Sequence, residues 1–171
     1  MKKSFFLATA MLLIAFSESV AQSSKKTSWD FLKGQKELNV VFDYSDLKIE
    51  NQAESVYFAY KGEKWATKWE NGKTEFFSKF VGEANGKSKS IVLGNTPNAE
   101  FTATVKILSL DDDWDMKVVV IFTKTNDNNV LATKTIKGSA GTFGSATNLT
   151  GDAMLSTGRK FGKFISKKGR N

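Results

Sequence analysis

The stretch FTATVKILSLDDDWDMKVVVIFTKTNDNNVLATKTIK, residues 101–137, decides the fold of this chain. In residues 101–107, apolar side chains alternate with threonine and lysine, which is the period of a strand with one buried face. Residues 118–122 are apolar at every position, as is typical of a strand in the middle of a sheet. The polar run 126–129 predicts a hairpin loop that leads into a third strand over residues 130–136. The stretch therefore predicts an antiparallel meander.

The residues before and after this stretch predict a further strand and the helices. Alternation over residues 38–44 indicates a strand. Aromatic side chains at helical steps predict a helix over residues 52–69, ended by Asn71-Gly72, and a second helical piece over residues 74–84; these are two helices or one bent helix. Apolar residues at helical spacing over residues 149–167 predict a closing helix. We therefore predict an α+β fold, with a mainly antiparallel sheet of about four strands, helices packed on one face and a C-terminal amphipathic helix.

Two glycines, Gly158 and Gly162, lie four residues apart in the predicted closing helix. Each costs about 1 kcal/mol of helix stability relative to alanine. We expect this cost to be offset by close backbone contact between the helix and the sheet.

The beginning of the chain has the features of a secretory signal. Two lysines precede an apolar run over residues 5–16, and the small residues of Ser19-Val20-Ala21 mark a cleavage site before Gln22. A helix of this length rises only about 18 Å, too short for a hydrocarbon core of about 30 Å. We expect no transmembrane segment, and a product that is periplasmic or secreted. The predicted organisation is a signal peptide at residues 1–21, a flexible lead at 22–28 and a single α+β domain at 29–171.

The composition excludes several classes of chemistry. The chain has no histidine and no cysteine, which excludes His-based triads, cysteine nucleophiles, disulfides and the usual zinc sites. The acidic segment 111–115 lacks the glycine and the glutamate of an EF-hand loop, because Met116 and Phe122 occupy those places, and it reads as a polar connection between strands. The glycine-rich segment 138–144 matches no phosphate-binding spacing and is interpreted as a strand-to-helix linker. We expect no metal and no cofactor.

The excess positive charge lies at one end of the chain. The net charge of +7 falls to +6 when two lysines and one glutamate leave with the predicted signal, and from Arg159 onward the chain has basic residues and no acid. A nucleic-acid binder usually spreads its cations over a face with interleaved aromatics, so no nucleic-acid partner is expected. The alternative to anion binding is that these cations stabilise a helix C-terminus and keep the protein soluble. The candidate binding residues are Arg159, Lys160, Lys163, Lys167 and Lys168.

A second candidate region is rich in aromatic side chains and contains Trp65 and Trp69. Exposed rings would form a platform for a carbohydrate or a peptide, and the two tryptophans would then be binding residues. Buried rings would belong to the core, which the large area buried by each aromatic side chain favours.

Several short motifs carry a resemblance to known proteins. Leu32-Lys33-Gly34-Gln35-Lys36 leading into residues 38–44, the pair Trp65 and Trp69, the strand start at residues 98–101 and the segment 158–164 resemble a family of small exported bacterial proteins with no assigned function. The resemblance covers residues 31–165 and implies the order strand, helix, sheet and closing helix. It carries over no catalytic residue. More remotely, the arrangement is similar to small α+β domains of envelope proteins, such as the N-terminal domain of the periplasmic protein of the Tol system.

These observations favour a non-catalytic binding or interaction module of the bacterial envelope over an enzyme, with an envelope protein or an anionic surface as its partner. One alternative is a carboxylate-dependent hydrolase that acts on polysaccharide, because acids and aromatics are the reactive and binding groups that remain. Another is an anionic-surface binder that uses the basic C-terminal helix.

Overall fold

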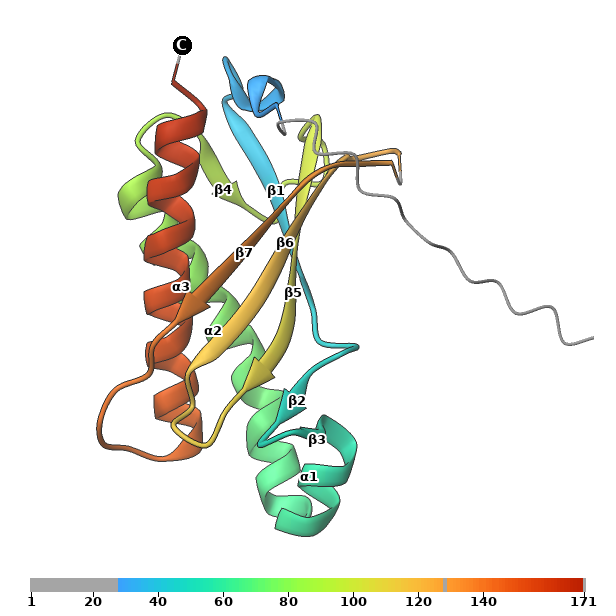
Figure 1. Ribbon diagram of the computed structural model, residues 1–171, viewed down its shortest axis with the longest axis vertical. Helices are drawn as coiled ribbons and strands as arrows, with labels where there is room; N and C mark the ends of the chain where they lie inside the picture. The colour runs from blue at the N-terminus through green and yellow to red at the C-terminus, as the bar shows by residue number, and fades with distance from the viewer. Residues whose placement is uncertain (1–27, 128, 171) are drawn as a thin grey trace, which may run out of the picture.

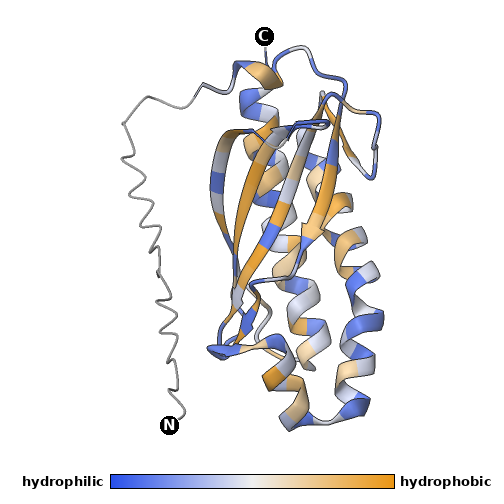
Figure 2. Ribbon diagram, turned by 90° about the vertical axis from the view of Figure 1, so that its right-hand side faces the viewer, coloured by the Kyte–Doolittle hydropathy of each residue, from blue (hydrophilic) through white to orange (hydrophobic). Residues whose placement is uncertain are grey.

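The computed structural model describes residues 28–127 and 129–170. The predicted signal peptide and most of the predicted lead lie outside these residues. Two helices lie side by side on one face of a sheet (Figures 1 and 2). The elements, in chain order, are η1 (Asp30–Leu32), β1 (Glu37–Asp43), β2 (Lys48–Ile49), β3 (Gln52–Ala53), α1 (Glu54–Lys61), α2 (Glu63–Ser88), β4 (Val92–Gly94), β5 (Phe101–Leu110), β6 (Met116–Lys124), β7 (Val130–Gly138) and α3 (Ala146–Lys168).

The predicted meander of β5, β6 and β7 is confirmed. Both pairings are antiparallel, and Phe122 of β6 pairs with Ala103 of β5 and with Ala132 of β7. In β5, fully buried Ala103, Val105 and Ile107 alternate with partly exposed neighbours, as the period of the sequence predicts. Hydrophobic segments run along these strands in Figure 2. The buried side chains of these strands lie on the face of the sheet that α2 and α3 cover. The core is on this face.

The prediction of about four mainly antiparallel strands is wrong, because the sheet is mixed and has seven strands. β1 pairs in parallel with both β4 and β5, and β2 pairs in parallel with the end of β5. Parallel neighbours require a crossover connection, and α1 and α2 provide it between β1 and β5. The strands that the sequence did not reveal, β2, β3 and β4, have two or three residues each, too few to display a period.

The predicted helix boundary at Asn71-Gly72 is also wrong. The chain breaks at Gly62, whose φ of 92° ends α1, and α2 then continues without interruption to Ser88. Gly72 is buried against the ring of Phe76, where an added Cβ would lie 3.0 Å from a ring carbon. Asn85 also lies within the helix, and its side chain forms two hydrogen bonds with the backbone of Leu93 in β4, at 2.7 and 2.8 Å. Both residues therefore serve packing and strand attachment rather than helix termination.

Helix α3 packs in parallel with α2. An added Cβ at Gly158 would collide with the carbonyl group of Phe80, and one at Gly162 would collide with that of Ala84. The two glycines thus allow close contact with α2, not with the sheet as expected. The glycine that meets a neighbour across the sheet interface is Gly138 of β7, which contacts α3. As a result of the parallel packing, α2 and α3 end at the same tip of the molecule (Figure 1).

No helix within residues 28–127 and 129–170 has the length and apolar character needed to cross a membrane.

Candidate functional site

The tip at which α2 and α3 end gathers cations from separate parts of the chain. A hollow of about 560 Å³ lies between the two helix ends, and a neighbouring one of about 430 Å³ lies between the end of α3 and the start of the described chain. We call this region the basic end and define it by the cations that line the two hollows: Lys33, Lys87, Lys89, Lys163, Lys167, Lys168 and Arg170.

The basic end has little negative charge to balance these cations. Among the residues that line the hollows, Asp30 is the one acid, and its carboxylate lies 2.5 Å from the ammonium of Lys33. The hydrogen bond from Lys33 lowers the pKa of Asp30. The other cations of the basic end form no ion pair with the described residues. The C-terminal ends of α2 and α3 contribute about half a negative charge each. This is less than the positive charge of the cations that form no ion pair, so the region keeps a strong positive potential.

The structure separates the five predicted basic residues into two groups. Lys163, Lys167 and Lys168 lie at the basic end. Arg159 and Lys160 lie earlier along α3 and have partners of their own. Arg159 Nε donates to Glu83 Oε2 at 3.1 Å, and Lys160 Nζ donates to the carbonyl oxygen of Lys137 at 2.6 Å.

Sequence reasoning did not name Lys33, Lys87, Lys89 or Arg170 as binding residues of this site. Lys87 and Lys89 come from the end of α2, and their approach to α3 depends on the parallel packing of the two helices. Lys89 lies in a tight γ-turn with φ of 61° and ψ of −41°, in which the N–H of Ser90 donates to the carbonyl of Ser88 at 2.8 Å. This turn directs the chain from α2 toward β4.

The predicted pair Trp65 and Trp69 lies near the opposite end of the molecule. Both line a hollow of about 220 Å³ between α1, α2, the β5–β6 turn and the start of α3. Trp69 is 3% exposed and also belongs to the core, whereas Trp65 is 44% exposed. The expectation that the rings form the core therefore holds for Trp69 but not for Trp65. We call this hollow the aromatic pocket; it is lined by Glu50, Tyr57, Phe58, Lys61, Trp65, Trp69, Trp114, Ala146 and Thr147.

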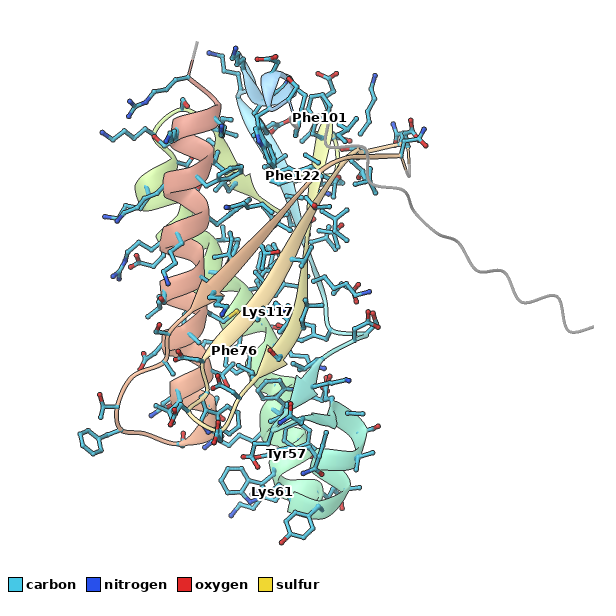
Figure 3. The ribbon with its side chains drawn as sticks, viewed as in Figure 1. Tyr57, Lys61, Phe76, Phe101, Lys117 and Phe122 are labelled. Atoms are coloured by element: carbon cyan, nitrogen blue, oxygen red, sulfur yellow. The ribbon has the colours of Figure 1, made fainter. Side chains whose placement is uncertain are left out.

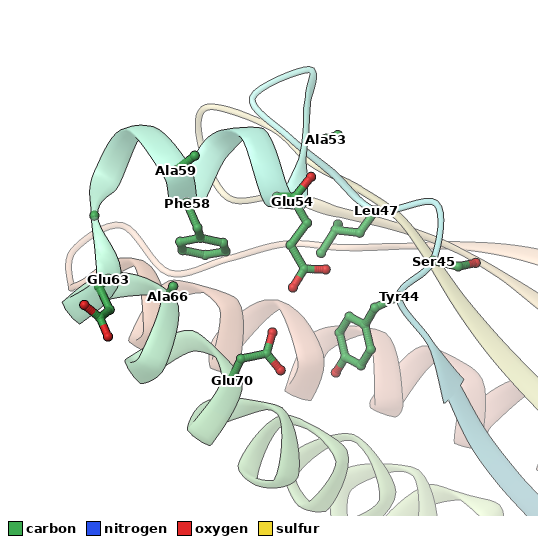
Figure 4. A pocket seen from close by; sticks show the side chains of 12 residues that line it. Tyr44, Ser45, Leu47, Ala53, Glu54, Phe58, Ala59, Glu63, Ala66 and Glu70 are labelled. Atoms are coloured by element: carbon green, nitrogen blue, oxygen red, sulfur yellow. The ribbon is translucent and has the colours of Figure 1, made fainter.

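A larger hollow of about 650 Å³ lies beside α1 and carries carboxylates (Figure 4). Glu54 and Glu70 point into it near Tyr44. Both carboxylates lie 2.7 Å from the ammonium of Lys73, which also stacks 4.8 Å from the centroid of the Tyr44 ring. The pKa of Tyr44 is raised, mainly by burial and also by the charges of the two glutamates.

The arrangement in the larger hollow does not match the carboxylate pair of a glycoside hydrolase. Such a pair needs one carboxylic acid that donates a proton to the leaving group. Glu54 and Glu70 both accept from the single ammonium of Lys73, so neither is placed to donate. The group is a structural ion cluster that joins α1 to α2.

The acidic segment 111–115 forms the β5–β6 turn. The N–H of Asp115 donates to Asp111 Oδ1 at 2.8 Å, and Asp115 Oδ1 accepts from the N–H of Ala140 at 2.9 Å. These carboxylates hold the turn and attach it to the β7–α3 linker, which is the polar connection that the sequence indicates. Within the part of the chain that the structure describes, no three acidic side chains converge as metal ligands.

Comparisons with known proteins give remote similarity alone. No family model matches this chain, and no curated protein matches it. A solved structure from Xanthomonas campestris, described as family-model DUF330, has a TM-score of 0.44 and 9% identity over 78% of this chain and 84% of that chain. The PelC dodecamer from Paraburkholderia phytofirmans has a TM-score of 0.40 and 11% identity over 81% of this chain and 90% of that chain. A hypothetical protein from Chlamydia trachomatis has a TM-score of 0.39 and 12% identity over 78% of this chain and 95% of that chain. The chain is thus remotely similar in structure to a DUF330 protein and to other small bacterial proteins.

Proposed function

We propose that this protein is a non-catalytic, extracytoplasmic binding module of the bacterial envelope that docks through its basic end on an anionic phospholipid surface. The observation that carries the proposal is the convergence of α2 and α3 at one tip, where cations from separate segments meet with a single paired acid. The signal predicted at residues 1–21 is the reason to place the module outside the cytoplasm.

Lysine and arginine side chains near an anionic bilayer contribute about 1 kcal/mol each, and the attraction fades within a Debye length of about 8 Å at physiological salt. Such binding needs many cations within a small area rather than a fitted pocket. Lys87, Lys89, Lys163, Lys167 and Arg170 are all exposed and surround one hollow, which meets this requirement. The helices point along the long axis of the molecule, so docking at their ends would hold it upright, with α1 distant from the bilayer (Figure 1).

A bilayer is favoured over a nucleic acid by the aromatic content of this region. Trp29 is the one aromatic side chain that lines the two basic hollows, and it packs edge-on against Phe164 and Phe122, with ring centroids 4.7 and 5.4 Å away. Its ring therefore packs against other rings of the protein and is not free to stack with a base. Single-stranded nucleic acids are bound on aromatic side chains that stay free to stack with bases.

The test is co-sedimentation of the mature chain with vesicles of phosphatidylglycerol and phosphatidylcholine, and with vesicles of phosphatidylcholine alone. We expect binding to the anionic vesicles at 50 mM salt and its loss at 500 mM salt. A variant with glutamine at Lys87, Lys89, Lys163 and Lys167 should bind about tenfold or more weakly.

The matched control replaces four exposed lysines elsewhere, namely Lys48, Lys64, Lys68 and Lys117, and has the same net charge. Lys117 lies on the sheet, far from the end of α3 (Figure 3). An equal loss in both variants would show that total charge, not the basic end, drives binding. Binding to the soluble polyanion heparin without binding to anionic vesicles would assign the site to a polysaccharide and overturn the bilayer proposal.

A further inference from the structure

The aromatic pocket is a second site with a different chemistry. Its walls are five aromatic rings, and its polar groups are the carboxylate of Glu50, the ammonium of Lys61 and the hydroxyl of Thr147. The rings are those of Tyr57, Phe58, Trp65, Trp69 and Trp114. Tyr57 and Lys61 lie together at the α1 end of the molecule (Figure 3). We propose that this pocket binds one pyranose ring of a neutral saccharide. The proposal is independent of docking at the basic end.

Contacts with the surrounding protein hold the rings of Trp69, Tyr57 and Trp114 in place. Trp69 Nε1 donates to Glu54 Oε1 at 2.7 Å. The hydroxyl of Tyr57 donates to Glu50 Oε1 at 3.3 Å, and its ring meets that of Trp114 edge-on, at a centroid distance of 6.4 Å. These three side chains are 9% exposed or less, whereas Trp65 is 44% exposed and forms the mouth of the pocket. A ligand would therefore enter past one accessible indole into a cage of fixed rings.

The backbone that supplies two of these residues is in an unfavourable conformation. Glu50 has φ of 48° and Trp114 has φ of 64°, and among the described non-glycine residues positive φ occurs elsewhere at Asn51 and Lys89 alone. A left-handed conformation is unfavourable for residues with a Cβ atom and persists where neighbouring structure imposes it. The N–H of Glu50 donates to the carbonyl of Leu110 at 2.9 Å, and that of Trp114 donates to the carbonyl of Asp111 at 3.0 Å. Two separate turns are thus fixed in strained form, and both direct a side chain into this pocket.

The charges in the pocket select for a neutral ligand. Lys61 Nζ lies 5.2 Å from the centroid of the Tyr57 ring, so an added cation would meet a resident ammonium. An anion would meet the carboxylate of Glu50. A pyranose has apolar C–H faces that can lie against aromatic rings, and hydroxyl groups at its edge that can donate to Glu50 and accept from Lys61. The volume of about 220 Å³ is smaller than a typical drug-sized site and suits a single ring.

The experiment is a titration of the mature chain with maltose, cellobiose and N,N′-diacetylchitobiose. Binding is measured by tryptophan fluorescence and by saturation-transfer NMR of the sugar protons. The pocket should bind at least one of these three saccharides with a dissociation constant of about 1 mM. Trp65→Ala should weaken binding about tenfold or more, and Trp65→Phe should weaken it less because a ring remains.

Phe143→Ala is the matched control, since Phe143 lies in the β7–α3 linker, is 91% exposed and does not line the pocket. It should bind as the unmodified chain does. Circular dichroism of both variants would show whether each is folded. Absence of a signal for all three saccharides at 50 mM, or an equal loss in Trp65→Ala and Phe143→Ala, would overturn the proposal. Binding of choline chloride in place of the saccharides would also overturn it, because the pocket would then be a cation site.

Discussion

Gly158 of α3 lies directly against the backbone carbonyl of Phe80 in α2. The contact is repeated one turn later between Gly162 and Ala84, and it is accompanied by stacking of the Phe80 and Phe161 rings at a centroid distance of 5.4 Å. Because the two helices run in the same direction, this close approach fixes the position of one helix end relative to the other. The basic end is a direct consequence.

Gly158→Ala should lower the free energy of unfolding by about 1–3 kcal/mol, because the new methyl group meets backbone atoms that cannot rotate away. Gly82→Ala is the matched control in α2, where a Cβ would have no neighbour within 4 Å. It should raise the free energy of unfolding by about 1 kcal/mol through helix propensity alone. Urea denaturation of both variants measures the difference, and stabilisation by Gly158→Ala would show that the helices are not in contact there.

Lys73→Met should lower the free energy of unfolding by about 1–3 kcal/mol, a range reduced from that of a fully buried pair because these groups are partly exposed. The variant leaves Glu54 and Glu70 side by side without the ammonium that both contact. The control is Lys33→Met, whose pair with Asp30 is more than half exposed on both sides and should contribute much less to stability. Similar losses in the two variants would contradict the role assigned to the ion cluster.

Stability should fall at alkaline pH partly because of Tyr57. The pKa of Tyr57 is raised to about 12, mainly by burial and also by the charge of Glu50 and the hydrogen bond to it. An unfolded tyrosine has a pKa of about 10. The unfolded chain therefore releases this proton first, and the contribution is complete below pH 10 and lost as the pH rises toward 12. The free energy of unfolding should decrease less steeply over this range in Tyr57→Phe. Tyr60→Phe, at an exposed position, should keep the steeper decrease of the unmodified chain.

Lys89→Gly should raise the free energy of unfolding by about 0.5–1 kcal/mol, because glycine adopts the positive φ of the γ-turn without the penalty of a Cβ atom. Lys87→Gly removes the same charge from the last turn of α2 and should lower it by about the same amount. Thermal denaturation at fixed ionic strength compares the two. If both glycine variants were destabilised alike, the strain assigned to Lys89 would be disproved.

The parts of the fold that depend on local pattern could be predicted from the sequence. Alternation over residues 101–107 marked β5, and helical spacing marked α3, because one buried face repeats through each element. Parallel pairing of β1 with β5 leaves no comparable signature, since it depends on where the crossover returns the chain. The end predicted for the second helical piece, at residue 84, is wrong for a similar reason, because Asn85 continues the helix and its side chain bonds to a strand that follows the helix.

Some residues of the candidate sites could likewise be predicted from the sequence, and others could not. The distribution of charge and of aromatic residues along the sequence identified Lys163, Lys167 and Trp65 as residues of interest, since both are visible without structure. Glu50 and Trp114 could not be associated with Trp65, because they reach the aromatic pocket through two turns that lie far apart in the sequence. Their juxtaposition depends on the hydrogen bond from Glu50 to the end of β5.

The first and last described residues, Ser28 and Arg170, line the same hollow at the basic end. An affinity tag or fluorescent fusion joined directly at Ser28 or Arg170 would therefore stand over the lysines and could mask or mimic their attraction to vesicles. The linker between β7 and α3 offers a better attachment point, because Phe143 is 91% exposed and lies at the other end of α3. A reporter inserted there would leave the basic end accessible during vesicle-binding assays.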